Sequence, residues 1–175
     1  MHTERLILRP WRANDLAAFR ALNADAEVME HMPACLDAQQ SDSLALRLAD
    51  AVETRGWGLW AVEVPGEADF IGYVGLNPPA VAMPMGECVE LAWRLARSFW
   101  RRGFASEAAR AALDFGFSRL GLAEIVSYTV PRNRRSWAVM ERIGMTRDPD
   151  GDFDHPALPE GHPLRRHLLY RKGRP

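Results

Sequence analysis

Cysteine, long hydrophobic runs and net charge are all scarce in this chain of 175 residues, and each shortage excludes a class of protein. The two cysteines, Cys35 and Cys88, form no C-x-x-C pair, which argues against a zinc site and a disulfide and favours the reduced thiols of a cytoplasmic protein. No run of about 18 apolar residues exists and the first residues resemble no signal peptide, so we predict no membrane span. The formal net charge of −1 argues against a nucleic-acid or membrane partner.

The glycine-rich fingerprints of the common nucleotide-binding folds are also missing. No G-x-G-x-x-G turn follows the first apolar run at residues 5–9, which disfavours a Rossmann sheet, and there is no P-loop pattern G-x-x-x-x-G-K-[ST]. We find no internal repeat and no linker long enough to divide the chain. The length fits one domain over residues 1–175, and 47% apolar residues suffice for an ordinary globular core.

What remains is an alternation of strand and helix patterns. Apolar runs with β-branched residues predict strands, whereas cap residues, helical spacing and terminal glycines predict helices. In chain order we expect a strand at 5–9, helices at 14–23 and 37–55, strands at 57–64, 70–76 and 87–95, a helix at 105–120, a strand at 124–130, a helix at 133–143 and a strand at 167–171. A loop rich in proline and methionine is expected at 77–86, and a loop-rich tail from Met145.

The segment most informative about chemistry joins the strand run at 87–95 to the following helix, and it reads W-R-R-G-F-A-S-E over residues 100–107. A helix start leaves backbone N–H groups unpaired and carries partial positive charge, which suits phosphate. Gly103 lets the turn approach a ligand closely, and Arg97, Arg101 and Arg102 add positive charge. These residues predict an anion site; the alternative is a solvated basic turn before an ordinary helix.

The run W-R-R-G-F-A-S-E-A resembles the acetyl-CoA signature of the GNAT superfamily of N-acetyltransferases. Three further segments match that superfamily in the right order, namely T-E-R-L-I-L-R-P at the start, V-E-L-A-W-R-L before the turn and N-R-R-S-W-A-V-M-E-R-I-G-M after it. The sequence is most similar to the ribosomal-protein amino-terminal acetyltransferase type, the RimJ/RimL-like branch. Arg101 stands where glycine is common, which indicates a different loop conformation or an additional phosphate contact.

The resemblance implies an α/β (α+β) fold, with a mixed, mostly antiparallel sheet and helices on both faces. The fourth and fifth strands of that sheet splay apart and receive the pantetheine arm of acetyl-CoA, the co-substrate. Splayed strands leave backbone groups unpaired, and those of Trp93 and Leu95 are expected to bind the arm. Asn133 is expected to contact the arm, to cap its helix, or both. The backbone amides expected to hold the diphosphate are those of Arg101, Arg102, Gly103, Phe104, Ala105 and Ser106.

The implied reaction is acetyl transfer from acetyl-CoA to a primary amine, at a protein N-terminus or on a small molecule, by direct attack in a ternary complex. Ser136 is the candidate donor to the leaving thiolate, with a local backbone bond as its alternative role; Tyr128 is a weaker candidate. Glu90 is the candidate general base, directly or through water, and Glu87 is the substitute. A solvated or ion-paired carboxylate is the alternative role of Glu90.

Three other functions stay open at this point: transfer from another acyl-CoA, a coenzyme-A-binding sensor without turnover, and a phosphate-binding domain of unrelated fold. The oligomeric state is open too, a homodimer included. Fold and cofactor do not choose among protein N-termini, amino acids, polyamines and aminoglycosides as acceptors. The acceptor pocket is expected near the early helices, Trp57, Trp60 and loop 77–86. Four methionines could line it, although core packing or loop filling is the favoured role of each one singly: Met29, Met32, Met83 and Met85.

The tail holds three histidines and two aspartates in an unusual run, F-D-H-P-A-L-P-E-G-H-P-L-R-R-H. Their spacings match no metal-binding pattern, so we predict no metal. The resemblance places this tail in a last hairpin beside the acceptor site, where a histidine can orient or deprotonate an amine. The alternative is that these side chains satisfy loop backbone: His155, His162 and His167, with Asp152 and Asp154.

Overall fold

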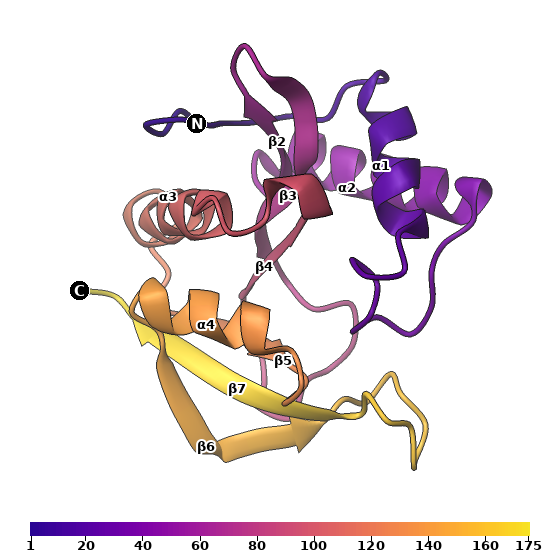
Figure 1. Ribbon diagram of the computed structural model, residues 1–175. Helices are drawn as coiled ribbons and strands as arrows, with labels where there is room; N and C mark the ends of the chain where they lie inside the picture. Colours follow the sequence, from indigo (N-terminus) through magenta and orange to yellow (C-terminus); the bar gives the residue numbers. More distant parts are fainter.

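The computed structural model describes residues 1–175 and contains one seven-stranded sheet with four α-helices (Figure 1). Its elements are β1 (Ile7–Arg9), α1 (Asp15–Ala24), α2 (Ala38–Arg55), β2 (Leu59–Val64), β3 (Ala68–Asn77), β4 (Glu90–Leu95), the 3-10 helix η1 (Arg97–Phe99), α3 (Phe104–Ser118), β5 (Glu124–Thr129), α4 (Arg134–Arg142), β6 (Thr146–Asp154) and β7 (Arg166–Gly173). The strand order is β1-β2-β3-β4-β5-β7-β6. Only β4 and β5 pair in parallel, which confirms the expected mixed, mostly antiparallel sheet.

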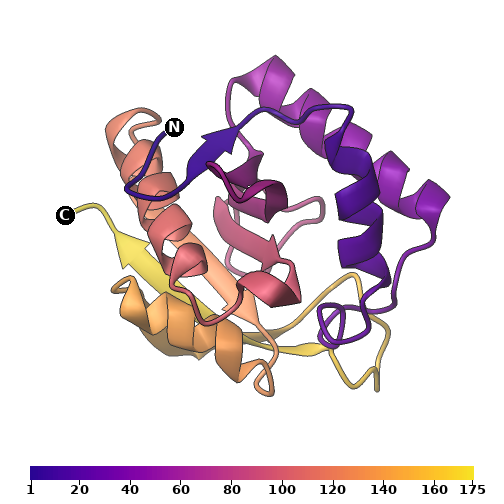
Figure 2. The same ribbon diagram turned by 45° about the horizontal axis from the view of Figure 1, so that its top comes forward.

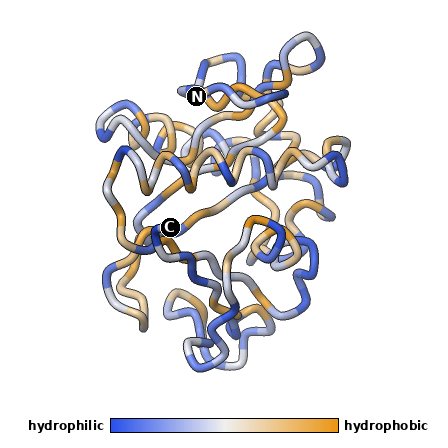
Figure 3. Tube along the Cα trace, turned by 90° about the vertical axis from the view of Figure 1, so that its left-hand side faces the viewer, coloured by the Kyte–Doolittle hydropathy of each residue, from blue (hydrophilic) through white to orange (hydrophobic).

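The helices cover both faces of the sheet, as expected. Figure 2 shows α3 and α4 on one side of the strands and α1 and α2 on the other. Side chains alternate between these faces along each strand. On β3, Val74 and Leu76 join the main core cluster under α3, whereas Tyr73 packs with Phe19 and Leu22 of α1. Hydrophobic segments lie mostly inside the chain trace, and hydrophilic segments gather in the outer loops (Figure 3).

Interactions at the two helix caps set the bounds of α2, as the sequence predicted. The Asp37 side chain accepts a hydrogen bond from the Gln40 N–H at 2.8 Å, and the Gln40 side chain accepts one from the Asp37 N–H at 3.0 Å. This reciprocal pair satisfies two N–H groups that a helix start leaves free. Gly56, with φ of 74°, then ends the helix in the left-handed conformation that glycine adopts without strain.

The opening segment fastens the sheet edge to the layer of α1. Arg9 is only 5% exposed, and its guanidinium pairs with Asp15 at 2.7 Å and with Glu63 at 2.8 Å. Hydrogen bonds from Arg9 to these carboxylates, that to Asp15 first, outweigh burial and raise the pKa of Arg9. Breaking one partner of such a buried pair leaves a charge uncompensated. The segment therefore anchors β1 and α1 together.

The tail is where the structure departs most from the sequence prediction. The segment after Met145 is not loop-rich: it forms β6, which pairs with β7 in the final hairpin that the resemblance implied. The β6 sequence, T-R-D-P-D-G-D-F-D, is poor in strand-forming residues, which is why its pattern gave no strand signal. Its proline is tolerated because β6 is an edge strand, and the pairing shifts register between Asp148 and Phe153. All other predicted bounds lie within three residues of the observed ones.

The structure contains no disulfide, no helix suited to span a membrane and no cluster of metal-binding side chains. Both cysteines are free, as the sequence predicted. None of the helices combines the length and the hydropathy needed to cross a bilayer. No group of three or more histidine, cysteine, aspartate or glutamate side chains is arranged to hold a metal ion.

Candidate active site

The strands β4 and β5 part after a single register pair. Glu90 opposite Val126 is the only Cα pair of their parallel ladder. The Val126 N–H donates to the Val89 carbonyl at 3.0 Å, and Ser127 Oγ donates to the Leu91 carbonyl at 2.8 Å. Beyond Leu91 no β5 backbone pairs with β4. This divergence confirms the expected splay.

The free edge of β4 turns backbone groups of Trp93 and Leu95 into the opening. The Ala96 N–H donates to the Ile71 carbonyl at 2.8 Å, so the backbone of Ala96 faces β3. Backbone groups alternate sides along an antiparallel strand, so Trp93 and Leu95 face the opening instead. The indole N–H of Trp100 donates a hydrogen bond to the Leu95 carbonyl at 2.7 Å. The Leu95 N–H and both backbone groups of Trp93 remain for a ligand.

The turn before α3 presents consecutive backbone N–H groups that have no acceptor within the chain. None of the N–H groups from Arg101 to Ser106 donates a hydrogen bond, and the first donor is Glu107, whose N–H reaches the Gly103 carbonyl at 3.0 Å. Arg101 and Gly103 have φ values of 60° and 83°. Left-handed residues in such a turn direct successive N–H groups into one concavity, which together with the helix start binds anions.

Arg101 is the only non-glycine residue of the chain with a positive φ. It stands at the position where the resemblance led us to expect glycine, and it adopts a conformation that glycine favours. Such a conformation costs a non-glycine residue about 1 kcal/mol or more. The turn therefore has a glycine-like geometry in spite of the arginine.

The first residues of the chain brace this turn from outside. Glu107, in the first turn of α3, accepts hydrogen bonds from Thr3 Oγ1 at 2.6 Å and from the Arg5 N–H at 2.8 Å. The Arg5 guanidinium bonds Glu107 at 2.8 Å and the Arg102 carbonyl at 3.0 Å. Burial opposes the charge, yet these hydrogen bonds hold the pKa of Glu107 below its ordinary value. Because Arg5 is bound to α3, β1 starts two residues later than predicted.

The side chain of Arg102 does not point to the opening. Its guanidinium pairs with Glu67 at 2.5 and 2.7 Å and lies over the rings of Phe99 and Phe104. Among the residues predicted to bind the coenzyme through backbone groups, only Arg102 lies outside the cavity between the strands. Only its backbone N–H is left for the diphosphate contact that the sequence predicted.

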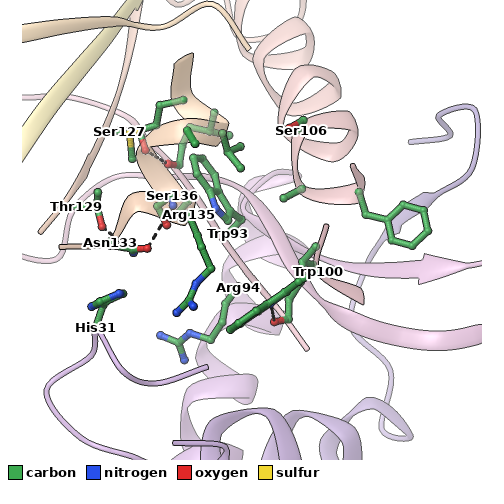
Figure 4. A pocket seen from close by; sticks show the side chains of 18 of the residues that line it. His31, Trp93, Arg94, Trp100, Ser106, Ser127, Thr129, Asn133, Arg135 and Ser136 are labelled. Carbon is green, nitrogen blue, oxygen red and sulfur yellow. Dashed lines mark hydrogen bonds between the residues drawn. The ribbon is translucent and has the colours of Figure 1, made fainter. Parts of the chain in front are cut away.

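A cavity of about 510 Å³ fills the opening between β4 and β5 (Figure 4). This volume is in the range of small-molecule and cofactor sites. The predicted site residues that line it are Glu90, Trp93, Leu95, Arg101, Gly103, Phe104, Ala105, Ser106, Asn133 and Ser136. The fold therefore brings residues from β4, the turn, α3 and α4 to one place.

Asn133 and Ser136 enter the cavity from the start of α4. Asn133 Oδ1 accepts from the Ser136 N–H at 3.2 Å, which confirms the predicted cap, and Asn133 Nδ2 donates to Thr129 Oγ1 at 2.9 Å. One amide hydrogen of Asn133 is left for a ligand. The Ser136 hydroxyl forms no hydrogen bond within the chain, so the alternative of a local backbone bond has no support.

Glu90 and Tyr128 form a hydrogen-bonded pair at the deep end of the opening. Tyr128 Oη donates to Glu90 Oε2 at 2.7 Å. Burial raises the pKa of Glu90 to about 7, although the Tyr128 bond works against that rise. Burial and the nearby Glu90 carboxylate also raise the pKa of Tyr128, so it stays a phenol. Glu90 is thus neither ion-paired nor freely solvated, whereas Glu87 is exposed outside the cavity.

Two tail histidines lie beside this pair but outside the cavity. The rings of His155 and His167 have centroids 6.0 and 5.8 Å from that of Tyr128. His155 Nδ1 accepts from the Ala157 N–H at 3.2 Å, and His167 Nδ1 lies 3.0 Å from the Arg165 carbonyl. Burial lowers the pKa of both rings. With His162 Nδ1, which accepts a loop N–H at 3.1 Å, these contacts confirm the loop-backbone role.

Most of the residues expected around the acceptor do not line this cavity. Trp60 is 5% exposed and packs edge-on against Phe115, with ring centroids 5.1 Å apart. Trp57 lies under the Arg55 guanidinium. Of the four methionines only Met32 lines the cavity. Those outside it are Met29, Met83 and Met85.

Sequence reasoning missed three of the four arginines that line the cavity. One is Arg94 of β4, and the other two are Arg135 and Arg142. The latter two lie on α4, seven residues apart and thus on one helix face, a spacing that could have identified them. Arg142 donates to Ser106 Oγ at 3.3 Å, next to the turn. Arg135 pairs with Glu30 at 2.7 Å and lies over the Trp100 ring.

Comparison with known proteins agrees with this geometry. The family described as an acetyltransferase (GNAT) domain matches residues 5–146. The uncharacterized protein YkkB of Bacillus subtilis is 31% identical over 144 residues, which cover 82% of this chain and 83% of YkkB. A solved acetyltransferase from Agrobacterium tumefaciens is 32% identical, with a TM-score of 0.78 over 98% of this chain and 92% of its own.

The expected RimJ/RimL-like branch is supported only by more distant likeness. A solved RimL, a ribosomal L7/L12 α-N-protein acetyltransferase in complex with coenzyme A, has a TM-score of 0.76 but 15% identity, over 98% of this chain and 95% of its own. Such a likeness shows the fold alone, so the branch stays a prediction. The matched domain spans most of the chain, and the chain belongs to the GNAT acetyltransferase family, which transfers acetyl groups from acetyl-CoA.

Proposed function

We propose that this acetyltransferase acetylates a primary amine, which attacks the thioester of acetyl-CoA directly within a ternary complex. The observation that carries the proposal is the layout of the opening between β4 and β5. Unpaired N–H groups suited to a diphosphate lie at one end, at residues 101–106, and a carboxyl group with a pKa of about 7 lies at the other. Between them runs a strand edge with free amide groups.

In the bound complex the coenzyme spans this layout. The diphosphate accepts hydrogen bonds from the turn at the start of α3, where the helix dipole adds to the attraction. The pantetheine amides pair with Trp93 and Leu95 along the free edge of β4, as an added strand would. The remaining amide hydrogen of Asn133 reaches the arm from the other side. The thioester then lies near Glu90 and Ser136, which line the same cavity.

The reaction moves two protons from the ammonium form of the acceptor. Glu90 takes the first proton, which frees the nitrogen lone pair to attack the thioester carbon. A β4 backbone N–H facing the opening stabilises the negative oxygen of the tetrahedral intermediate. The C–S bond then breaks, the nitrogen releases its second proton, and the thiolate gains a proton with help from the Ser136 hydroxyl. The products are the amide and free coenzyme A.

A turnover screen tests the proposal. Purified protein and acetyl-CoA are incubated with peptides that have free N-termini and with small amines, and thiol release is measured alongside product mass. We expect amine-dependent thiol release with at least one acceptor class. Coenzyme A binding without release for any amine would favour the sensor, and faster turnover with succinyl-CoA would favour another acyl donor.

Ser136→Ala tests the proposed thiolate donor. We expect kcat to fall about 10-fold, since one hydrogen bond to a developing charge is worth about 1.5 kcal/mol or more. The Kd of coenzyme A should change less than about 2-fold, because the lost bond forms mainly as the thiolate develops. Ser136→Thr keeps the hydroxyl and is the matched control. An unchanged kcat in the alanine variant removes Ser136 from the mechanism.

Arg101→Gly separates conformation from charge in the turn. Glycine adopts the observed φ of 60° without strain, so the melting temperature should stay the same or rise slightly. If the guanidinium contacts a phosphate, the Kd of coenzyme A should rise about 5-fold, which corresponds to about 1 kcal/mol. Calorimetric titration measures that change, with Arg101→Lys as the control that keeps the charge. An unchanged Kd for the glycine variant means that Arg101 serves no phosphate.

A further inference from the structure

The cavity has an unusual charge balance for a site that receives an amine. It is lined by four arginines, and Glu90 is its only acidic residue. A polycationic acceptor would be repelled by such a lining. The inference drawn from this imbalance rests on the proposed function, since it concerns the acceptor of the same reaction.

Three of the four arginines have an evident task. Arg101 belongs to the turn and Arg142 is bonded to Ser106 in the first turn of α3, so both lie at the end of the cavity proposed for the diphosphate. Arg135 at the mouth is neutralised by Glu30 at 2.7 Å. Arg94, on β4, is the only one of the four that neither lies at the diphosphate end nor pairs with a carboxylate.

Arg94 is a partly buried guanidinium that contacts only uncharged groups. Its Nη1 donates to Asn23 Oδ1 at 2.6 Å, its Nη2 lies 3.0 Å from the Met32 sulfur, and it lies over the Tyr73 ring. No carboxylate of the chain forms an ion pair with it. Withdrawing a cation from water without a counter-charge is costly. Five N–H donors on a guanidinium leave hydrogens free for a ligand.

The position of Arg94 assigns it to the acceptor rather than to the coenzyme. Glu90 and Arg94 are four residues apart on β4, so both side chains project to the same face of the sheet. That face is the one covered by α1 and the segment that follows it, from which His31 and Met32 reach the cavity. Figure 4 shows the side chains of His31, Arg94 and Arg135 directed into one region. An acceptor amine beside Glu90 places its remaining atoms toward this region.

We propose that the acceptor amine carries a carboxylate, and that Arg94 binds this carboxylate while Glu90 receives the proton of the amine. The substrate class is therefore amino acids, or peptides with an acidic residue next to the N-terminus. Polyamines and aminoglycosides are poor acceptors. The fork of the guanidinium matches a carboxylate in two hydrogen bonds, which gives both affinity and orientation.

Matched acceptor pairs test the proposal on the unaltered enzyme. Each pair differs only in the carboxylate: a free amino acid against its amide, and a peptide with glutamate at its second position against one with glutamine. We expect kcat/KM to favour the carboxylate partner about 10-fold or more in at least one pair, and spermidine to be slower than either. The pair that shows the preference identifies a free amino acid or a peptide as the source of the carboxylate.

Variants then assign the preference to a residue. Arg94→Met should bring the ratio within each pair close to one and leave the KM of acetyl-CoA unchanged, whereas Arg94→Lys should keep part of the preference. Arg135→Met is the matched control, and its ratio should change less because Glu30 already neutralises that arginine. Thermal melting checks folding, since Arg94 also ties β4 to Asn23.

The outcomes separate this inference from the function it builds on. Spermidine acetylated as well as the carboxylate-bearing acceptors, or equal rates within every matched pair of the wild type, would overturn the inference while leaving amine acetylation in place. A folded Arg94→Met variant that keeps the full preference would overturn it as well. Absence of any amine-dependent turnover instead overturns the proposed function itself.

Discussion

Gly103→Asp should abolish coenzyme binding while the protein stays folded. We expect the Kd of coenzyme A to rise at least about 100-fold, equivalent to about 2.7 kcal/mol. A carboxylate at this position would repel the diphosphate. It would also accept hydrogen bonds from the free N–H groups at the start of α3, as aspartate does at helix N-caps. Tryptophan fluorescence can follow the titration, because Trp93 and Trp100 line the cavity.

The fold should tolerate this substitution. Gly103 has φ of 83°, a conformation that aspartate and asparagine adopt more readily than other side chains. A Cβ atom there would lie 3.2 Å from the tip of the flexible Arg5 side chain, which can move. Gly103→Asn has the same shape and strain without the charge, so the difference between the two variants isolates repulsion. A Kd for the aspartate variant within about 3-fold of the wild type would place the diphosphate elsewhere.

Glu90→Gln should lower kcat about 100-fold, because a positioned general base contributes roughly that factor or more. In the wild type kcat should rise with pH through about 7, where Glu90 loses its proton, and then level off. The glutamine variant should lack this rise of kcat with pH. Measurement of kcat between about pH 5.5 and 9 with one acceptor checks both the size of the loss and the shape of the profile.

The same substitution should stabilise the protein at alkaline pH. The pKa of Glu90 lies above its value in the unfolded chain, so the folded state binds the proton more tightly. The free energy of unfolding therefore falls as pH rises from about 4.5 to about 7, by about 3 kcal/mol at most, and Glu90→Gln removes that loss. Slower turnover with higher stability at pH 8 is the result expected of a general base whose pKa is raised in the folded protein.

Tyr128→Phe is the matched control for this experiment. It keeps the carboxylate but removes the hydrogen bond that lowers the pKa of Glu90. The rise of kcat with pH should therefore move to higher pH. If the glutamine variant keeps a kcat within about 3-fold of the wild type at every pH, water alone removes the proton and Glu90 is not the base.

The parts of the fold that could be predicted from sequence are those specified by nearby residues. The bounds of α2 follow from Asp37 with Gln40 and from Gly56, which act within one or two turns of chain. Strand β6 could not be predicted, because pairing with β7 rather than local preference holds its aspartates, Pro149 and Gly151 in the sheet.

The site divides in the same way. The turn at residues 101–106 could be predicted because its glycine, arginines and helix start are contiguous in the chain. The contact between Glu90 and Tyr128, and the unpaired state of Arg94, depend on how strands 38 residues apart and helix α1 come together. Trp60 was expected near the acceptor pocket, but it packs against α3. The alternation of side chains along a strand shows that Trp60 faces one side of the sheet, but it does not show that α3 covers that side.

The single register pair between β4 and β5 has a consequence for how the two parts of the sheet cohere. Strands β1–β4 and strands β5–β7 meet along a seam that backbone hydrogen bonds close at one end only. A coenzyme bound in this seam as proposed would add hydrogen bonds to the free edge of β4 on one side and to Asn133 on the other, so it would connect the two parts of the sheet as well as react. Each turnover would then break and re-form that connection.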